Sequence, residues 1–160
     1  MLRISKMADY GTIVLTTMAK EPERTQSVAE IVSLTGLPVP SVSKLLKIFI
    51  RQGLVQSLRG AKGGYKLARP PAEITTAQII NAIDGPVGMT QCSGGPGLCV
   101  HQPRCQVHSH WHRISRIMLE ALEQISLQQM SEPVVDTMSL ADLRPQRQRV
   151  VHRQTTGETS

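Results

Sequence analysis

The 160 residues are enough for one compact domain with a hydrophobic core and an appendage, and too few for two full domains. No apolar run of about 18 residues or more occurs and no signal-peptide cleavage pattern follows the apolar stretch near the start, so we expect a soluble cytoplasmic protein with no membrane partner. Three cysteines in a reducing compartment leave metal binding, redox chemistry or inert burial, and disfavour a disulfide framework.

The positive charge of the chain is concentrated in its first half. Residues 1–70 hold eleven Lys and Arg against four acidic residues, a net charge of +7, whereas residues 71–160 carry a net charge of −1. This excess suggests that the first half binds a polyanion. Only four aromatic residues occur in the chain, which argues against base stacking on single strands or RNA loops.

Two helices are predicted at the start of the chain. Apolar residues at helical spacing predict a first helix within residues 4–22, which ends before Pro22. Ser27 and Glu30 have the spacing of a capping box, in which each side chain bonds a free backbone N–H at a helix start. Gly36 then closes this second helix after about two turns.

A third helix, over residues 40–53, is predicted to have one apolar side and one basic side. The apolar side holds Val42, Leu45, Leu46, Phe49 and Ile50. The other side holds Ser41, Ser43, Lys44, Lys47 and Arg51. Alternating residues 54–58 and 65–67 then flank a Gly-rich basic turn and predict a β-hairpin. The order of helix, short helix, turn, basic helix and hairpin is typical of a mainly α, winged helix-turn-helix fold.

Four parts are predicted along the chain. Residues 1–85 form the winged helix-turn-helix head, residues 86–108 a cysteine-rich loop, residues 107–130 a long helix, and residues 131–160 a polar, disordered tail. The long helix has apolar residues at separations of three and four, which predict a narrow seam for a partner helix and therefore a homodimer. Packing of this helix back on its own domain is the alternative. The seam consists of Val107, Trp111, Ile114, Met118, Ala121 and Ile125.

The third helix and the hairpin tip predict an interface for double-stranded DNA, with a merely solvated basic face as the alternative. In such an interface the basic side chains of the helix neutralise phosphates, while the two serines and Lys44 touch base edges. Arg59, at the hairpin, reaches a phosphate or the minor groove. The candidate DNA-binding residues are Ser41, Ser43, Lys44, Lys47, Arg51, Arg59 and Lys62.

All three cysteines lie in one Gly/Pro-rich loop with the spacing C-x6-C-x5-C-x2-H, formed by Cys92, Cys99, Cys105 and His108. Thiolates are soft donors suited to iron-sulfur clusters or zinc, and a flexible loop lets three of them converge. From the residues alone, a Cys3His zinc site, a thiol redox sensor and inert cysteines stay open. His101 is interpreted as a surface residue or an alternative ligand, and His110 and His112 as exposed or packing residues.

Three segments, DYGTIVL, LVQSLRGAKGGYKLARP and AIDGP, followed by spaced cysteines and a long helix, resemble the iron-sulfur winged-helix regulators of the IscR and NsrR family. The resemblance covers residues 1 to about 130, and within the family it looks closest to regulators of the SUF iron-sulfur assembly operon. It implies a homodimer that binds a 2Fe-2S cluster and represses or activates promoters according to the cluster state. On this resemblance we expect a repressor of iron-sulfur assembly genes.

The resemblance also implies which residues hold the cluster. Members of the IscR branch use three cysteines and a histidine at nearly this spacing, and Cys92, Cys99, Cys105 and His108 stand at those positions with one extra residue between the first two. In the NsrR-like branch an aspartate near the start of the first helix, from the other subunit, completes the site. Asp9 is therefore the rival fourth ligand, and nitric-oxide sensing the rival function.

The sequence contains none of the enzyme motifs that its glycines and cysteines could suggest. It has no phosphate-binding G-x-x-x-x-G-K-[ST] loop, no G-x-S-x-G and no H-E-x-x-H, and its cysteines lack the C-x-x-C spacing of a thioredoxin-like site. We therefore expect a protein that is not an enzyme. A metal-binding assembly adaptor that does not bind DNA is the alternative from another class.

Overall fold

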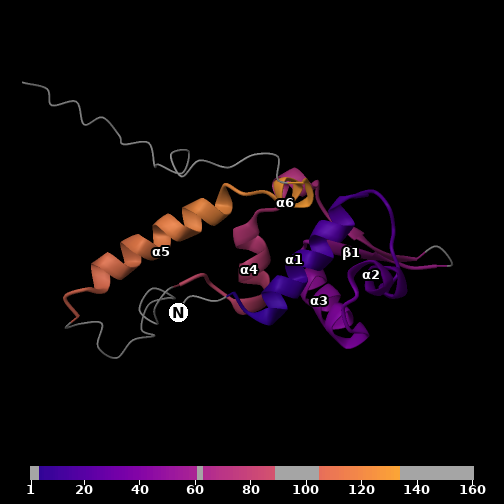
Figure 1. The fold of residues 1–160 in the computed structure, drawn as a ribbon, viewed down its shortest axis with the longest axis horizontal. Coiled ribbons are helices and arrows are strands. Elements are labelled where there is room, and N and C mark those ends of the chain that lie inside the picture. The colour runs from indigo at the N-terminus through magenta and orange to yellow at the C-terminus, as the bar shows by residue number, and fades with distance from the viewer. Residues whose placement is uncertain (1–3, 61–62, 89–104, 134–160) are drawn as a thin grey trace, which may run out of the picture.

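The computed structural model describes residues 4–60, 63–88 and 105–133. In these ranges the elements are α1 (Lys6–Ala19), α2 (Val28–Thr35), α3 (Val39–Arg51), β1 (Val55–Leu58), β2 (Gly64–Leu67), the 3-10 turn η1 (Pro71–Glu73), α4 (Thr76–Asp84), α5 (His108–Glu123) and α6 (Leu127–Ser131). All of them except α5 gather in one head, from which α5 extends (Figure 1). This is the mainly α, winged helix-turn-helix architecture that the sequence predicts.

Capping boxes of short polar side chains begin α2, where the sequence predicts one, and also α4. The Ser27 hydroxyl accepts from the Glu30 N–H at 3.2 Å, and the Ser27 N–H donates to the Glu30 carboxylate at 2.6 Å, so the capping box of α2 is complete. Gly36 ends this helix in the left-handed conformation, with φ 67°. Thr75 and Gln78 form the same box at the start of α4. These caps fix the helix boundaries locally.

The core of the head lies where α1, α2 and α3 meet. The buried side chains of α3 are Val42, Leu45, Leu46 and Phe49, as predicted. The sequence also predicts Ile50 on the buried apolar side, and this is wrong, because 38% of the residue is exposed. Consecutive helical residues are rotated by about 100°, so Ile50 falls at the edge of the stripe centred on its neighbours. Gly11 lets α1 lie close to α3 and α4. A Cβ at this position would lie 2.9 Å from Phe49 Cζ of α3 and would collide with Ile83 Cδ1 of α4.

The wing is an antiparallel hairpin joined to the head along β2. β1 pairs with β2 so that Val55 lies opposite Leu67. Gln26 and Tyr65 exchange backbone hydrogen bonds of 2.9 and 2.8 Å, which join the hairpin to the segment between α1 and α2. Gly64 has no room for a side chain there, since a Cβ would lie 2.6 Å from the Gln26 carbonyl oxygen. The hairpin is therefore fixed to the helices on one side.

The single helix predicted over residues 107–130 is two helices in the structure. Ser126 accepts from the Gln129 N–H at 3.2 Å while its own N–H donates to the Gln129 side chain at 2.8 Å, and this capping box starts α6. Leu127 of α6 is fully buried in the head core, and its N–H donates to the Ile74 carbonyl oxygen at 2.7 Å. The chain thus returns to the head after α5. Residues 134–160, for which a disordered tail is predicted, lie outside the described residues.

None of the described helices is by itself long and apolar enough to cross a membrane. Only α2 and α3 reach the required length and composition when they are taken together, and the pair is bent by 118° at the break between them. Ile31, Leu45 and Phe49 of this pair are fully buried in the head core.

Candidate nucleic-acid interface and metal centre

The exposed side of α3 carries positive charge without a compensating acid. Lys44, Lys47 and Arg51 are exposed, and their spacing of three and four residues places them in one row along the helix. Ser41 and Ser43 are half-buried on the two flanks of this row. No Asp or Glu occurs in α3. All five side chains predicted to bind DNA from this helix therefore lie outside its buried apolar stripe.

The basic side chains of the head differ in whether acids neutralise them. Arg24 lies 3.0 Å from the Glu21 carboxylate and 3.1 Å from that of Glu30, and Lys66 lies 3.3 Å from that of Glu23. Within the described part of the chain, no salt bridge involves Lys44, Lys47, Arg51 or Arg59. The cations of α3 and Arg59 of the wing thus carry positive charge that no described carboxylate neutralises, and they can neutralise phosphates.

The wing contributes one described candidate to this surface. Arg59 directly follows β1 and is exposed, whereas Lys62 lies outside the described residues. The hairpin extends past α2, in the direction opposite to α5 (Figure 1). The wing can therefore contact DNA on the side of the head that faces away from α5.

One carboxylate of the head, Glu30, has a pKa below its ordinary value of 4.5. The largest cause is the hydrogen bond from the Ser27 backbone N–H, and the Ser27 side chain and Arg24 lower the pKa further. Glu30 therefore stays ionised at neutral pH and holds both the start of α2 and Arg24.

Two predicted metal ligands, Cys105 and His108, adjoin each other where the loop meets α5. His108 is the first residue of α5, and its backbone N–H donates to the Cys105 carbonyl oxygen at 3.3 Å. Both residues are half-buried. The His108 Nε2 atom is buried and has no hydrogen-bond partner among the described residues. A buried polar atom without a partner is costly, so this nitrogen fits the role of a metal ligand.

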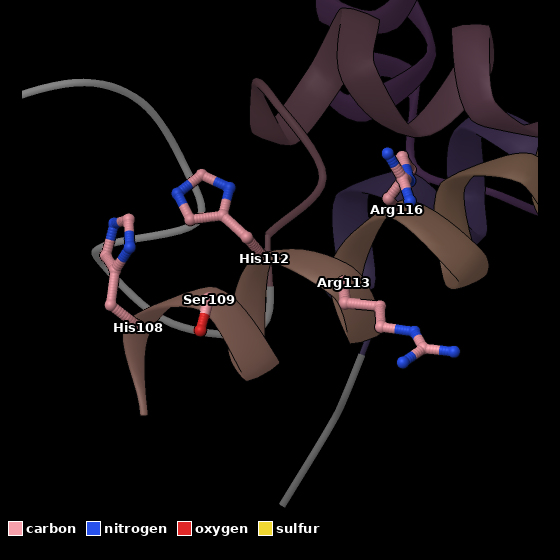
Figure 2. Close-up of a pocket in the computed structure, with 5 residues that line it drawn as sticks. All are labelled: His108, Ser109, His112, Arg113 and Arg116. Carbon is pink, nitrogen blue, oxygen red and sulfur yellow. The ribbon is translucent and has the colours of Figure 1, made fainter. Parts of the chain in front are cut away.

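A second imidazole lies against His108. The rings of His108 and His112 have their centroids 4.4 Å apart and are tilted by 58°. Both line a cavity of about 540 Å³ along α5, together with Ser109, Arg113 and Arg116 (Figure 2). The sequence predicts His112 to be an exposed or packing residue, and its spacing of four from His108 places the two on one helix face.

Asp9, the rival fourth ligand, does not share the His108 cavity. It lies in the first turn of α1 and lines a separate cavity of about 730 Å³ with residues of α4 and α6, including Thr76 and Met130. Cys92, Cys99 and His101 lie outside the described residues. Within residues 4–60, 63–88 and 105–133, no three His, Cys, Asp or Glu side chains come together as a metal site. The complete ligand set thus stays a prediction.

A comparison with family models shows where the chain belongs. Residues 4–133 match the model named Rrf2, described as an iron-dependent transcriptional regulator. The chain belongs to the Rrf2 family. The match runs from the start of α1 past the end of α6, so it covers the head and α5 alike.

Similar Rrf2-family proteins are transcriptional regulators. The chain is 30% identical over 144 residues to the HTH-type transcriptional regulator IscR of Xenorhabdus nematophila, a match that covers 88% of this chain and 87% of the relative. It is 32% identical over 126 residues to IscR of Aliivibrio salmonicida, covering 76% and 74% of the two chains. These relatives confirm a regulator that binds DNA, and not an enzyme.

Solved structures similar to this chain support the same fold. CymR, the global cysteine regulator of B. subtilis, has a TM-score of 0.64 at 29% identity, with 82% of this chain and 97% of CymR covered. IscR of T. potens has a TM-score of 0.63 at 28% identity, with 88% and 96% covered. Both likenesses confirm the winged-helix fold.

Proposed function

We propose that this Rrf2-family protein is a cytoplasmic, homodimeric repressor whose binding to promoter DNA follows the state of an iron-sulfur cluster. The family description as an iron-dependent regulator supports the dependence on iron. The similarity to IscR proteins and the resemblance of the wing and loop segments to SUF-type regulators support iron-sulfur assembly genes as targets.

The DNA-binding part of the proposal rests on the unpaired charge of α3 and the wing. With α3 in the major groove, Lys44, Lys47 and Arg51 neutralise phosphates, and Ser41 and Ser43 flank them toward the base edges. From the wing, Arg59 and Lys62 reach the adjacent backbone or the minor groove. Arg24 and Lys66 differ from these cations, because each lies within salt-bridge distance of a carboxylate of the head.

The observation that carries the cluster proposal is the buried Nε2 atom of His108 without a partner among the described residues, next to Cys105. In this proposal Cys92, Cys99, Cys105 and His108 hold a 2Fe-2S cluster, which supplies a labile, redox-active iron centre when bound. Asp9, contributed by the other subunit, is the alternative fourth ligand. Asp9 lines a cavity of the head that His108 does not share, and its contribution by the other subunit stays part of the proposal.

The proposed link between the loop and the head runs through the two ends of the loop. At its start, the Val87 N–H donates to Asn81 Oδ1 at 2.9 Å, and the Ser5 hydroxyl donates to the Asp84 carboxylate at 2.6 Å, so α4 and the start of α1 are joined there. At its end, Cys105 adjoins α5. Ligation of the loop cysteines therefore fixes α5 relative to the head, and with it the spacing of two heads on DNA.

The proposed homodimer rests on the exposed apolar side of α5. Val107, Ile114 and Ile117 are 52%, 40% and 43% exposed, and Ser115 is the one buried residue among the sixteen of α5. A helix that extends from the head in this way is suited to pair with a second copy. Two-fold symmetry then matches the two half-sites that helix-turn-helix dimers read.

The visible absorption spectrum of protein purified without air, with iron, sulfide and zinc measured on the same sample, tests the cluster. We expect a brown protein with near-equal iron and sulfide, and loss of both in Cys105→Ala and His108→Ala. His110→Ala, an exposed histidine two residues further along α5, is the matched control that keeps the colour. A colourless protein that holds zinc contradicts the proposal, and DNA affinity that is equal with and without the cluster contradicts the coupling.

A zinc-based or thiol-based sensor is the second candidate. A Cys3His donor set also suits tetrahedral zinc. In addition, CymR of Staphylococcus aureus, which is 26% identical over 85% of this chain with a TM-score of 0.63, has been solved in an oxidized form. Iron-free protein whose DNA affinity changes with a thiol oxidant and recovers with a reductant would favour this candidate over the cluster.

A further inference from the structure

The N-terminal tip of α3 is apolar and exposed. Pro38, Val39 and Pro40 are all exposed, and 54% of Val39 is accessible. One exposed apolar side chain on a surface needs no explanation. Three exposed apolar residues in succession are less common, and these three lie next to the row of α3 that carries Lys44 and Lys47.

The backbone of this tip offers few donors to a phosphate. Pro38, the N-cap residue, makes no side-chain hydrogen bond, and neither Pro38 nor Pro40 has a backbone N–H. The N–H groups of Ser41 and Val42 both donate to the Pro38 carbonyl oxygen, at 2.9 and 3.1 Å. A helix start of this kind differs from the anion-binding ends of helices, which present free N–H groups. Its chemistry suits an apolar partner.

The tip lies on the same accessible side of α3 as the predicted DNA contacts. Val39 precedes Ser43 by four residues and Pro40 precedes Lys44 by four, so each lies one turn nearer the helix start on the same face. When a recognition helix docks in the major groove, its N-terminal residues contact the base edges. The tip is therefore closer to the bases than Lys47 and Arg51, which lie further along the helix.

The one apolar group on the base edges of the major groove is the C5-methyl group of thymine. We propose that Val39, flanked by Pro38 and Pro40, is a specificity-determining residue that packs against the C5-methyl group of a thymine in each half-site. The inference rests on the docking of α3 in the proposed function, and adds sequence recognition to contacts that otherwise involve charge. It requires no hydrogen bond from the tip, in keeping with how few donors the tip offers.

Replacement of single thymines by deoxyuridine tests the inference, because deoxyuridine lacks only the methyl group. Duplexes are first selected from a random pool with the full-length wild-type protein, and each thymine of the selected site is then replaced in turn. We expect one thymine in each half-site at which the replacement weakens binding about fourfold, as for one buried methyl group. In Val39→Ala the same replacement has no further effect, because the methyl group has already lost its contact.

Ile50→Ala is the matched control, since Ile50 is also a β-branched, partly exposed residue of α3 and lies at its other end. This variant keeps the fourfold penalty for deoxyuridine. Thermal unfolding and the salt dependence of binding are measured on both variants to show that the fold and the phosphate contacts are unchanged.

Two results overturn the inference while the proposed function stands. One is a selected site at which no thymine-to-deoxyuridine replacement changes the affinity. The other is a deoxyuridine penalty of the same size in Val39→Ala and in the wild type, which assigns the methyl contact to another residue. If no duplex is enriched in the selection, the docking of α3 fails and this inference fails with it.

Discussion

The hydroxyl and the backbone N–H of Thr76 both donate to the carbonyl oxygen of Ile125, at 2.9 and 2.8 Å. These bonds join the first residue of α4 to the segment between α5 and α6, so the end of α5 is attached to the head at a buried position. A regulator that moves α5 relative to the head must do so with this attachment in place.

Replacement of Thr76 by Val is expected to lower the free energy of unfolding by about 1 kcal/mol, the usual contribution of one hydrogen bond. The side chain keeps its shape and the backbone bond to Ile125 stays, so only the hydroxyl bonds are lost. Denaturant unfolding of the full chain measures the change. A variant as stable as the wild type would show that water replaces the hydroxyl contact.

Replacement of Leu127 by Ala is expected to destabilise the head by about 2–5 kcal/mol, as for other fully buried leucines. The matched control is Leu34→Ala, because Leu34 is a leucine of the head that is 60% exposed on α2. Hydrogen exchange of the α1 amides, followed in both variants, shows whether the loss reaches the rest of the head. Equal protection of α1 in the Leu127 variant and the wild type would mean that α6 is not part of the head core.

The lowered pKa of Glu30 predicts that the protein loses stability on acidification. Its pKa is lowered in the folded state, mainly by the Ser27 N–H, so its ionised form stabilises the fold above the ordinary value of 4.5, and this stabilisation is lost as pH falls through the lowered pKa. Glu30→Gln keeps the capping hydrogen bonds but does not titrate. The stability gap between wild type and variant, measured by unfolding at several pH values, should be constant above 4.5 and narrow below it. A gap that widens on acidification contradicts the assignment.

Lys47 and Lys66 provide a matched pair for the DNA interface. Lys47 is exposed without a salt bridge among the described residues, whereas Lys66 lies 3.3 Å from the Glu23 carboxylate. We expect Lys47→Gln to weaken binding to all duplexes and to reduce the slope of log affinity against log salt by about one unit. Lys66→Gln should leave the slope unchanged. Equal slopes in both variants, read from fluorescence anisotropy titrations, would remove Lys47 from the phosphate contacts.

Introduction of a charge at Ile114 tests the dimer. Ile114 is 40% exposed in one chain, so Ile114→Asp should fold normally as a monomer while a carboxylate in the apolar seam prevents pairing. Sedimentation velocity should give a dimer for the wild type and a monomer for the variant. Ser109→Asp, an exposed position of the same helix, is the control that stays dimeric. A wild-type monomer refutes the dimer directly.

The helix-turn-helix and the wing could be predicted because their signals are local. A capping box at Ser27 and Glu30 and a Gly-rich turn between alternating segments act within a few residues, and both are found where the sequence places them. The break between α5 and α6 has a signal of the same kind, since Ser126 and Gln129 also form a capping box. The apolar spacing continues across this break, so periodicity alone predicts one helix there.

Other features depend on contacts that no local pattern contains. Gly11 is required because three helices come together around it, and the side chains that a Cβ there would meet, Ile83 and Phe49, are far away in the sequence. The proximity of His108 to His112 could be inferred from their spacing, but the burial of the His108 Nε2 atom could not, since it depends on how the chain folds around the start of α5. The ligand set as a whole depends in the same way on how distant parts of the loop converge.

The attachment at Ile125 makes α5 a lever with its pivot on the head. Its sixteen residues span about 24 Å, with His108 at the end away from the attachment and the Thr76 bonds at the pivot. A tilt of about 10° at the pivot displaces the far end by about 4 Å over that length. In the proposed coupling, a small rotation of α5 about this attachment therefore moves His108 by several times the distance that it moves the residues next to the attachment. By thermodynamic linkage, the proposed effect of the loop on DNA binding equals in free energy the effect of DNA on ligand binding by the loop.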